Sequence, residues 1–529
     1  MNKLLIIFII ALVFRFWNLT SFPVHFSMDE VAVGVAAREI LNKGVDEWGQ
    51  HLPLAFESVG DYKPPVNVYL TAISYAIFGM SEFATRFPVA LIGSLTALVL
   101  ALIARELKLT YWWFAGIFIA IVPWHVHFSR ATFGAIIGLF FASVGLLYFI
   151  KWINSKSAHR NLYISLSALS LSVWAYHSYR VFIPILSLAL IYIYKRDIVQ
   201  KNAKQYVFKA ICILAFFAIP FIFLTITTPA ISERAAATSF MRDAAFTNNL
   251  HKGNYTGVVE YIFDNDMYLI FREWSGKYIN YFDPRFLFWK GMQFTPPNFP
   301  GIGVMYAASF PIMLLGFSRM LTQKKQTRQL LLALLFLGPL PATFSINEQH
   351  PLRSLSWILF FALLAPIGFA YLKKLNKKYH ILIAAWMILL VFNIAYFKNI
   401  YTIQFPNVYS APWQYGYEQV SRYACQNKDN YDQVFISESF GADEYFTSLP
   451  QYYLAFYCGT HPFDHTNLQN KNTNIFIKRP LWEVDKDNYK NALFIAAPWD
   501  FPEDFDTSKI IKKLYFLDGK ESFWFVETK

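Results

Sequence analysis

Four long stretches of the chain carry no charged side chain. They contain no Asp, Glu, Lys or Arg over residues 131–150, 210–232, 329–347 and 354–372. A helix needs about 20 mainly apolar residues to cross the hydrocarbon core of a bilayer, and each stretch reaches or approaches that length. Only 16% of all residues are charged, whereas soluble globular proteins contain roughly 25%. The sequence therefore predicts a polytopic membrane protein and excludes an ordinary soluble enzyme, a disordered chain and a disulfide-rich secreted module.

Apolar segments suited to crossing a membrane recur along residues 1–400. The first is interrupted by Arg15 and is not followed by a small-residue cleavage site, so we interpret it as an uncleaved helix. We predict eleven spanning helices, near residues 4–20, 84–104, 111–128, 131–150, 161–179, 181–194, 206–228, 302–318, 329–346, 354–372 and 380–397. The uncharged stretch 66–81 is slightly short for a crossing, and we expect it to lie in the membrane interface.

Clusters of basic residues predict the orientation in the membrane. If 66–81 does not cross, all four clusters lie on the side of the N-terminus, and if it crosses, all four lie on the other side. Cytoplasmic loops are enriched in Lys and Arg, which favours the non-crossing topology with a cytoplasmic N-terminus. The clusters are Lys151/Lys156/Arg160, Lys195/Arg196/Lys201/Lys204, Lys324/Lys325/Arg328 and Lys373/Lys374/Lys377/Lys378. The net charge of +12 then reflects the membrane and its lipids, and we expect no nucleic-acid partner.

This topology places three sizeable segments outside the cytoplasm. The predicted divisions are a membrane domain, residues 1–398, with outer loops 21–83 and 229–301, and an extracytoplasmic soluble domain, residues 399–529. In the last segment short apolar runs alternate with turn residues, which is typical of strands in an α/β or β-rich domain. Cys425 and Cys458 both lie there and would pair in an oxidising compartment, although two cysteines alone have no spacing that decides between paired and free thiols. The predicted fold class is thus mostly α, with a C-terminal α/β or β-rich domain.

Two motifs in the first outer segment place charged side chains at the membrane boundary. Asp29 and Glu30 follow the first helix, while Asp61 and Lys63 precede two prolines and the interfacial stretch. A charged side chain at such a boundary is costly unless water solvates it or it takes part in binding or catalysis. Each motif also has a structural interpretation, because acids in a first turn complement the helix dipole and proline is favoured where a helix begins. Their common side of the membrane makes both motifs candidates for chemistry.

With these motifs in order, the chain resembles a known family. The acidic pair, the Asp61-Tyr62-Lys63-Pro64-Pro65 motif and the Glu82-x-x-x-Arg86-Phe87-Pro88 run resemble the family 39 glycosyltransferases of the polytopic C-type fold. That family includes protein O-mannosyltransferases and lipid A aminoarabinose transferases. The runs 123–130 and 278–303 are similar to later outer loops of its members. One departure is Tyr62, which separates the acid from the lysine, whereas some branches have them adjacent.

The resemblance implies sugar transfer from a polyprenyl-phosphate donor to an extracytoplasmic acceptor, which is a protein, a lipid or a glycan. Phosphate is a good leaving group, so unlike a glycosidase the enzyme needs no strong acid on the leaving oxygen. One carboxylate that deprotonates the acceptor hydroxyl then suffices for an inverting single displacement, while cations neutralise charge on the phosphate. We predict Asp29 as this base and Glu30 as a neighbour that orients the helix or raises the pKa of Asp29.

Outward-facing cations are the predicted phosphate ligands. Lys63 and Arg130 lie in two different outer loops. Arg353 lies at the outer start of a helix, where backbone amides also favour anions. Asp61 completes the predicted substrate-binding set. The structural alternative for each cation is a side chain that extends to lipid headgroups.

A divalent metal is the alternative source of positive charge. Asp264 and Asp266 form a D-x-D pattern in the third outer segment, and with Asp29 they would supply the oxygens that hard cations prefer. Lys63 and Arg130 already provide positive charge. We therefore predict no metal and no other cofactor.

Two other membrane functions compete with a glycosyltransferase. A transporter or flippase for lipid-linked sugars would show repeat symmetry and ionisable residues deep within spanning segments. Here the charges gather at the outer boundary, and the sequence contains no recognisable repeat. An oligosaccharyltransferase would carry a Trp-Trp-Asp-Tyr-Gly signature, whereas residues 413–417 read WQYGY. The sequence therefore favours the glycosyltransferase, with the flippase as the alternative.

Overall fold

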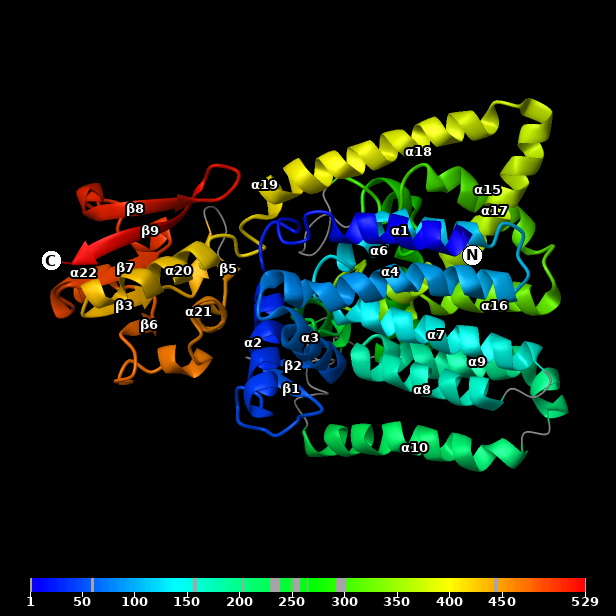
Figure 1. Cartoon of the computed structure of the whole chain (residues 1–529), viewed down its shortest axis with the longest axis horizontal. Helices are drawn as coiled ribbons and strands as arrows, with labels where there is room; N and C mark the ends of the chain where they lie inside the picture. The colour runs from blue at the N-terminus through cyan, green and yellow to red at the C-terminus, as the bar shows by residue number, and fades with distance from the viewer. Residues whose placement is uncertain are drawn as a thin grey trace. The chain divides into compact units, whose positions relative to one another are not determined.

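The chain divides into two compact units in a computed structural model (Figure 1). The structure describes residues 2–58, 61–155, 159–201, 204–228, 238–248, 250, 257–263, 265–291, 301–441 and 446–528. The helical unit contains Met1–Trp17, Leu54–Asn67 and Pro88–Lys398. The sheet unit contains Asn18–Pro53, Val68–Phe87 and Asn399–Lys529.

Apolar helices occur at each predicted span. They are α1 (Asn2–Phe16), α4 (Glu82–Glu106), α5 (Trp113–Ile121), α6 (Pro123–Phe128), α7 (Gly134–Asn154), α8 (His159–Ala175), α9 (Tyr179–Gln200), α10 (Lys204–Thr227), α15 (Ser309–Met320), α16 (Lys325–Leu337), α17 (Ile358–Tyr379) and α18 (Leu382–Asn399). In the described part of the chain, five helical segments are long and apolar enough to cross a membrane: Glu82–Glu106, Gly134–Asn154, Tyr206–Thr227, Leu355–Lys377 and Leu382–Tyr409. The chain is thus a mostly helical membrane protein, while the count of eleven crossings and the side on which each end lies stay predictions.

One predicted span is divided for a local reason, and the stretch predicted not to cross is short. The span 111–128 is divided into α5 and α6, because Pro123 follows the extended residue Val122 and cannot continue a helix. The uncharged stretch 66–81 forms α3 (Pro65–Phe78), which has 14 residues and is not among the five long helices. Its length agrees with a helix that does not cross.

Glycine and serine bring α7 close to its neighbours in the helical unit. A Cβ atom at Gly145 would lie 2.6 Å from the Leu169 side chain of α8, so only glycine permits this approach. The Ser165 hydroxyl of α8 donates to the Gly145 carbonyl at 2.8 Å, and the Ser172 hydroxyl donates to the Gly138 carbonyl at 2.8 Å. In lipid the hydrophobic effect does not drive helices together. Close packing at small residues and hydrogen bonds from hydroxyls to the backbone stabilise helix pairs there instead.

The sheet unit contains a five-stranded mixed sheet with the strand order β6-β3-β7-β9-β8. The strands are β3 (Gln433–Ile436), β6 (Ile475–Ile477), β7 (Ala492–Ala496), β8 (Ile510–Tyr515) and β9 (Glu521–Thr528). Strand β3 runs parallel to β6 and β7, and β9 runs antiparallel to β7 and β8. Every residue of β7 is buried, as expected for an apolar strand at the centre of a covered sheet.

The acidic segment near the N-terminus belongs to this same unit. Helix α2 (Met28–Lys43) buries Val31, Ala32 and Val35 in one core with α20 (Tyr417–Asn427), α21 (Pro450–Cys458) and the sheet. A Cβ at Gly34 would lie 2.8 Å from the Phe456 ring, which shows how closely α2 approaches α21. Cys425 and Cys458 form a disulfide that joins α20 to α21, with 6.3 Å between their Cα atoms. Much of the first outer segment, residues 18–53 and 68–87, therefore belongs to one compact unit with residues 399–529.

Candidate active site

The two acids in the first turn of α2 differ in their exposure. Asp29 is exposed, whereas Glu30 retains only 1% of its accessible surface. The Glu30 carboxylate accepts hydrogen bonds from the backbone N–H of Ser27 at 3.1 Å and from the Ser27 hydroxyl at 3.2 Å. This arrangement is half of a capping box, which stabilises the start of a helix. Glu30 is thus built into the fold, and Asp29 is the acid that a substrate can reach.

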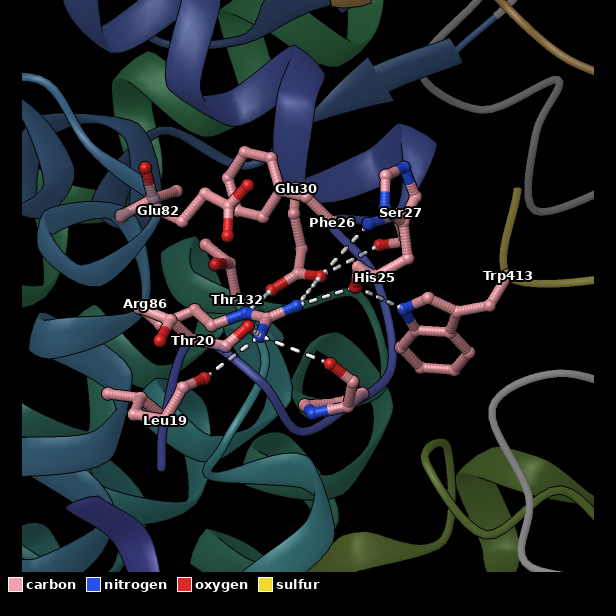
Figure 2. Close-up of polar contacts among 12 residues, drawn as sticks. Leu19, Thr20, His25, Phe26, Ser27, Glu30, Glu82, Arg86, Thr132 and Trp413 are labelled. Atoms are coloured by element: carbon pink, nitrogen blue, oxygen red, sulfur yellow. Dashed lines mark hydrogen bonds and ion pairs between the residues drawn. The ribbon is translucent and has the colours of Figure 1, made fainter. Parts of the chain in front are cut away.

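Arg86, near the start of α4, is the partner of Glu30 (Figure 2). Its Nε lies 2.8 Å from Glu30 Oε1, and its Nη2 lies 2.9 Å from Glu30 Oε2. The same guanidinium donates to the carbonyls of Leu19 at 2.9 Å and His25 at 2.7 Å. Arg86 is fully buried, so this charge is stable only because a carboxylate and carbonyl oxygens surround it. Arg86 therefore holds the segment that leads to Asp29 against the start of α4.

Residues just before Asp29 are held from a second direction (Figure 2). The Trp413 indole donates to the His25 carbonyl at 2.7 Å, and the Met28 backbone N–H donates to Gln414 at 3.0 Å. The His25 ring stacks on Tyr453 with 5.8 Å between the centroids. Burial, and then the charge of Arg86, lower the pKa of His25 to about 3, so this ring is neutral at physiological pH. These contacts fix the backbone from which Asp29 projects.

A group of cationic side chains gathers in the helical unit. Lys63 ends β2 (Asp61–Lys63), which pairs with β1 (Phe56–Ser58), and Arg353 donates to the Ser345 hydroxyl at 2.5 Å. His177 lies in the turn from α8 to α9, and Arg180 lies in the first turn of α9. Burial, followed by the charges of Arg180, Arg353 and Lys63, lowers the pKa of His177 to about 3. The structure therefore brings together two predicted phosphate ligands, Lys63 and Arg353, with two residues that the sequence analysis did not select.

A sequence signal for the two additional residues exists. The polar run Tyr176-His177-Ser178-Tyr179-Arg180 separates two apolar helices on the predicted outer side. An arginine between two membrane helices is costly unless water solvates it or it binds a ligand. We name Lys63, His177, Arg180 and Arg353 the cation cluster.

An apolar groove lies beside Arg180. A cavity of about 340 Å³ lies between α8, α9 and α10, and its lining includes Leu169, Trp174, Arg180, Ile183, Phe217 and Phe221. The Arg180 guanidinium carbon lies 4.9 Å from the centroid of the Phe221 ring. Within the described residues, the buried Nε of Arg180 has no hydrogen-bond partner. Arg180 thus adds a cation to a groove lining that is otherwise mainly hydrocarbon.

Arg130 has a different environment from the one predicted. Its Nη1 donates to the carbonyls of Phe14 at 2.9 Å and Arg15 at 3.1 Å, and its Nη2 donates to Trp17 at 2.5 Å. These carbonyls lie at the C-terminal end of α1, where a cation is favoured. The side chain is 1% exposed. We therefore assign Arg130 to the anchoring of α1 and leave it out of the cation cluster.

Three of the predicted residues have not yet been placed. Asp61 begins β2 opposite Ser58. Asp266 begins α14 (Asp266–Asn280), and Asp264 lies outside the described residues. Among the residues that the structure describes, no three His, Cys, Asp or Glu side chains are grouped so that they could hold a metal ion.

Comparison with known proteins identifies the architecture. Residues 62–223, which include Lys63, His177 and Arg180, match the family model "Dolichyl-phosphate-mannose-protein mannosyltransferase". No curated protein sequence matches the chain. Among solved structures, ArnT from Cupriavidus metallidurans in the apo state is similar with a TM-score of 0.51 and 12% identity, over 98% of this chain and 96% of that one.

A second structure is similar to the same extent. The Archaeoglobus fulgidus oligosaccharyltransferase in complex with Zn and sulfate has a TM-score of 0.53 and 14% identity, over 98% of this chain and 72% of that one. At such low identities these two structures inform on the fold alone. The fold is therefore that of the polytopic C-type membrane glycosyltransferases, and residues 62–223 match a glycosyltransferase family model.

Proposed function

We infer that the protein transfers a sugar from a polyprenyl-phosphate donor to an acceptor outside the cytoplasm, by an inverting single displacement. The observation that carries this proposal is the cation cluster beside the apolar groove. A lipid phosphate needs cations for its head group and a hydrocarbon surface for its tail. Arg180 is a member of the cation cluster and also lines the apolar groove. The family that matches residues 62–223 is named for a sugar donor of this kind.

The cation cluster is suited to a phosphate because the charges that act on His177 all have one sign. Arg180, Arg353 and Lys63 each lower its pKa, so the neutral ring lies in a strongly positive field. Like charges repel one another in a site of low dielectric, and a bound phosphate would relieve that repulsion. As the bond from the sugar to the phosphate oxygen breaks, negative charge on the phosphate increases. The cations then bind the transition state more strongly than the bound donor, which is the requirement for catalysis.

The second role, removal of a proton from the acceptor, is assigned to Asp29. The acceptor hydroxyl oxygen forms a bond to the anomeric carbon, its proton passes to the Asp29 carboxylate, and polyprenyl phosphate departs with the bonding electron pair. A base for this step must be reachable and firmly positioned. Asp29 is exposed, and the hydrogen bonds to His25, Met28 and Glu30 hold the segment around it.

Arginine variants of the cation cluster test the proposal. A charge-assisted hydrogen bond contributes about 1.5 to 3 kcal/mol, so Arg180→Ala and Arg353→Ala should each lower kcat/KM roughly 10- to 200-fold. If both side chains hold one phosphate, the double variant should deviate from additivity. Arg285→Ala is the matched control, because Arg285 is an exposed arginine in a surface ion pair with Asp283. Rates like those of the wild type in both single variants and the double variant would contradict the phosphate role.

A flippase for lipid-linked sugars is the alternative that this assay also separates. It would bind the same donor but would leave the bond between sugar and phosphate intact. Release of free polyprenyl phosphate by the purified protein, dependent on acceptor, is expected only of a transferase. The comparisons do not favour the flippase.

A further inference from the structure

A second apolar cavity lies in the helical unit, on a different set of helices. It has a volume of about 310 Å³ and lies between α5, α15, α17 and α18, with Phe114, Ile117, Met313, Phe369, Met387 and Leu390 among its lining residues. Sites for small molecules have volumes of roughly 300–1,000 Å³. None of its lining residues is shared with the groove at Arg180. A ligand here would therefore differ in place from the sugar donor.

Helix α18 lines this cavity and makes polar contacts with the start of α15. The Trp386 indole donates to the Ala308 carbonyl at 2.9 Å, and the Ala308 N–H donates to Asn393 at 2.8 Å. On the other side of α18, Ile388 is 71% exposed and Phe392 is 65% exposed. An apolar helix with so exposed a side is expected to face lipid. The cavity behind it is thus next to the hydrocarbon of the membrane.

Two lysines lie near Trp113, a residue that lines the cavity. Lys3 Nζ lies 5.9 Å from the centroid of the Trp113 ring, and Trp113 lines the cavity. Lys373 Nζ lies 4.9 Å from the centroid of the Tyr111 ring, which is itself 6.3 Å from the Trp113 ring. Both lysines are exposed. Tyrosine, tryptophan and lysine are the residues that meet lipid headgroups at a membrane interface.

We propose that this cavity binds one acyl chain of an anionic phospholipid, with the headgroup phosphate at Lys3 and Lys373. The hydrocarbon lining suits a chain that makes no hydrogen bonds, and two positive charges near Trp113 favour a negative headgroup over a zwitterionic one. This lipid is bound and not consumed. The site is independent of the proposed transfer reaction.

Lipid binding to the purified full-length protein tests the proposal. After removal of native lipid, native mass spectrometry would compare dioleoyl phosphatidylglycerol with dioleoyl phosphatidylcholine. We expect tighter binding of phosphatidylglycerol, weakened about fivefold by Lys3→Ala and about fivefold by Lys373→Ala. Lys374→Ala is the matched control, since Lys374 is an exposed lysine one position further along α17. Met313→Trp, which fills the cavity, should remove binding of both lipids.

Two further variants keep the proposal falsifiable. Ile117→Phe fills less of the cavity and replaces Met313→Trp if that variant does not fold. Tyr306 also lines the cavity, and its buried hydroxyl has no partner within the described residues. Tyr306→Phe should leave phosphatidylglycerol binding unchanged, because an acyl chain needs no donor. Equal affinity for the two lipids, loss of binding in Tyr306→Phe, or displacement of phosphatidylglycerol by polyprenyl phosphate would each overturn the proposal.

Discussion

Positive charge is treated in opposite ways in the two units. In the sheet unit, Arg86 is fully buried and is matched by the Glu30 carboxylate and by backbone carbonyls. In the helical unit, the charges of Lys63, Arg180 and Arg353 converge on one neutral histidine. A buried charge that is paired with an opposite charge stabilises a fold. A group of like charges without such a partner destabilises it, and such groups occur at sites that bind an anion. The comparison separates Arg86, which stabilises the fold, from the residues that we propose bind the donor phosphate.

The largest effect is expected from Asp29, the exposed member of the acidic pair. Asp29→Asn keeps the size of the side chain but removes the base, so transfer should fall roughly 10²- to 10⁴-fold. Because the side chain is exposed, thermal stability should stay unchanged. Asp432→Asn, at an exposed acid elsewhere in the sheet unit, is the matched control. Near-normal turnover in folded Asp29→Asn protein would remove Asp29 from the mechanism.

Glu30 should show the reverse pattern, a loss of stability. Removal of one partner from a buried ion pair costs about 3 to 5 kcal/mol, because the other charge is left uncompensated. Glu30→Gln and Arg86→Met should therefore each lower the thermal midpoint of the purified protein and its yield. The double variant removes both charges and should regain part of the stability.

The outcome for Glu30 also checks the division between the two acids. If Glu30→Gln keeps the stability of the wild type but loses transfer as Asp29→Asn does, Glu30 contacts substrate and the assignment is wrong. If Glu30→Gln and Asp29→Asn both lose stability but keep transfer activity, neither acid is the base.

The positions of the helices could be predicted from the sequence, because hydrocarbon leaves a backbone few alternatives to a helix. The lengths were less predictable. Val122-Pro123 ends α5 after 9 residues, and α15 has 12 residues because it begins only at Ser309, although the apolar run extends back to residue 302. Local composition reports that a segment is apolar, but packing and chain breaks decide where a helix ends.

The division of the acidic pair could not be predicted from the sequence. Asp29 and Glu30 are adjacent and similar, and the difference in burial depends on Arg86, 56 residues away from Glu30. The packing of α2 with the C-terminal sheet likewise depends on contacts between distant parts of the chain. The motif at residues 82–88 contains Arg86, but nothing in its pattern identifies Glu30 as the partner of this arginine. For the cation cluster, Lys63 was found because it lies in a motif and Arg353 because it lies at the outer start of a predicted helix, while His177 lies in a short turn and Arg180 in the first turn of α9.

The smallest effect is expected from His177, and its sign follows from linkage. In the free protein, burial and three positive neighbours lower the pKa of His177 to about 3, so the ring is neutral. A donor phosphate beside it would favour the protonated ring and raise this pKa. Donor affinity should therefore increase as pH falls through the raised pKa. As pH rises above that pKa, the gain in affinity should disappear and the affinity should return to that of the neutral ring.

The size of this pH effect is bounded, which makes it the sharpest test of the cation cluster. If the raised pKa does not exceed the ordinary value near 6.5, donor affinity at pH 5.5 is at most about tenfold higher than at pH 7.5. His177→Asn cannot titrate, so its donor affinity should vary less over the same interval. The measurement is donor binding to detergent-purified protein at both pH values, without acceptor, so that the base on the acceptor side does not contribute. An affinity that rises equally in wild type and His177→Asn would place the titrating group elsewhere and separate His177 from the donor phosphate.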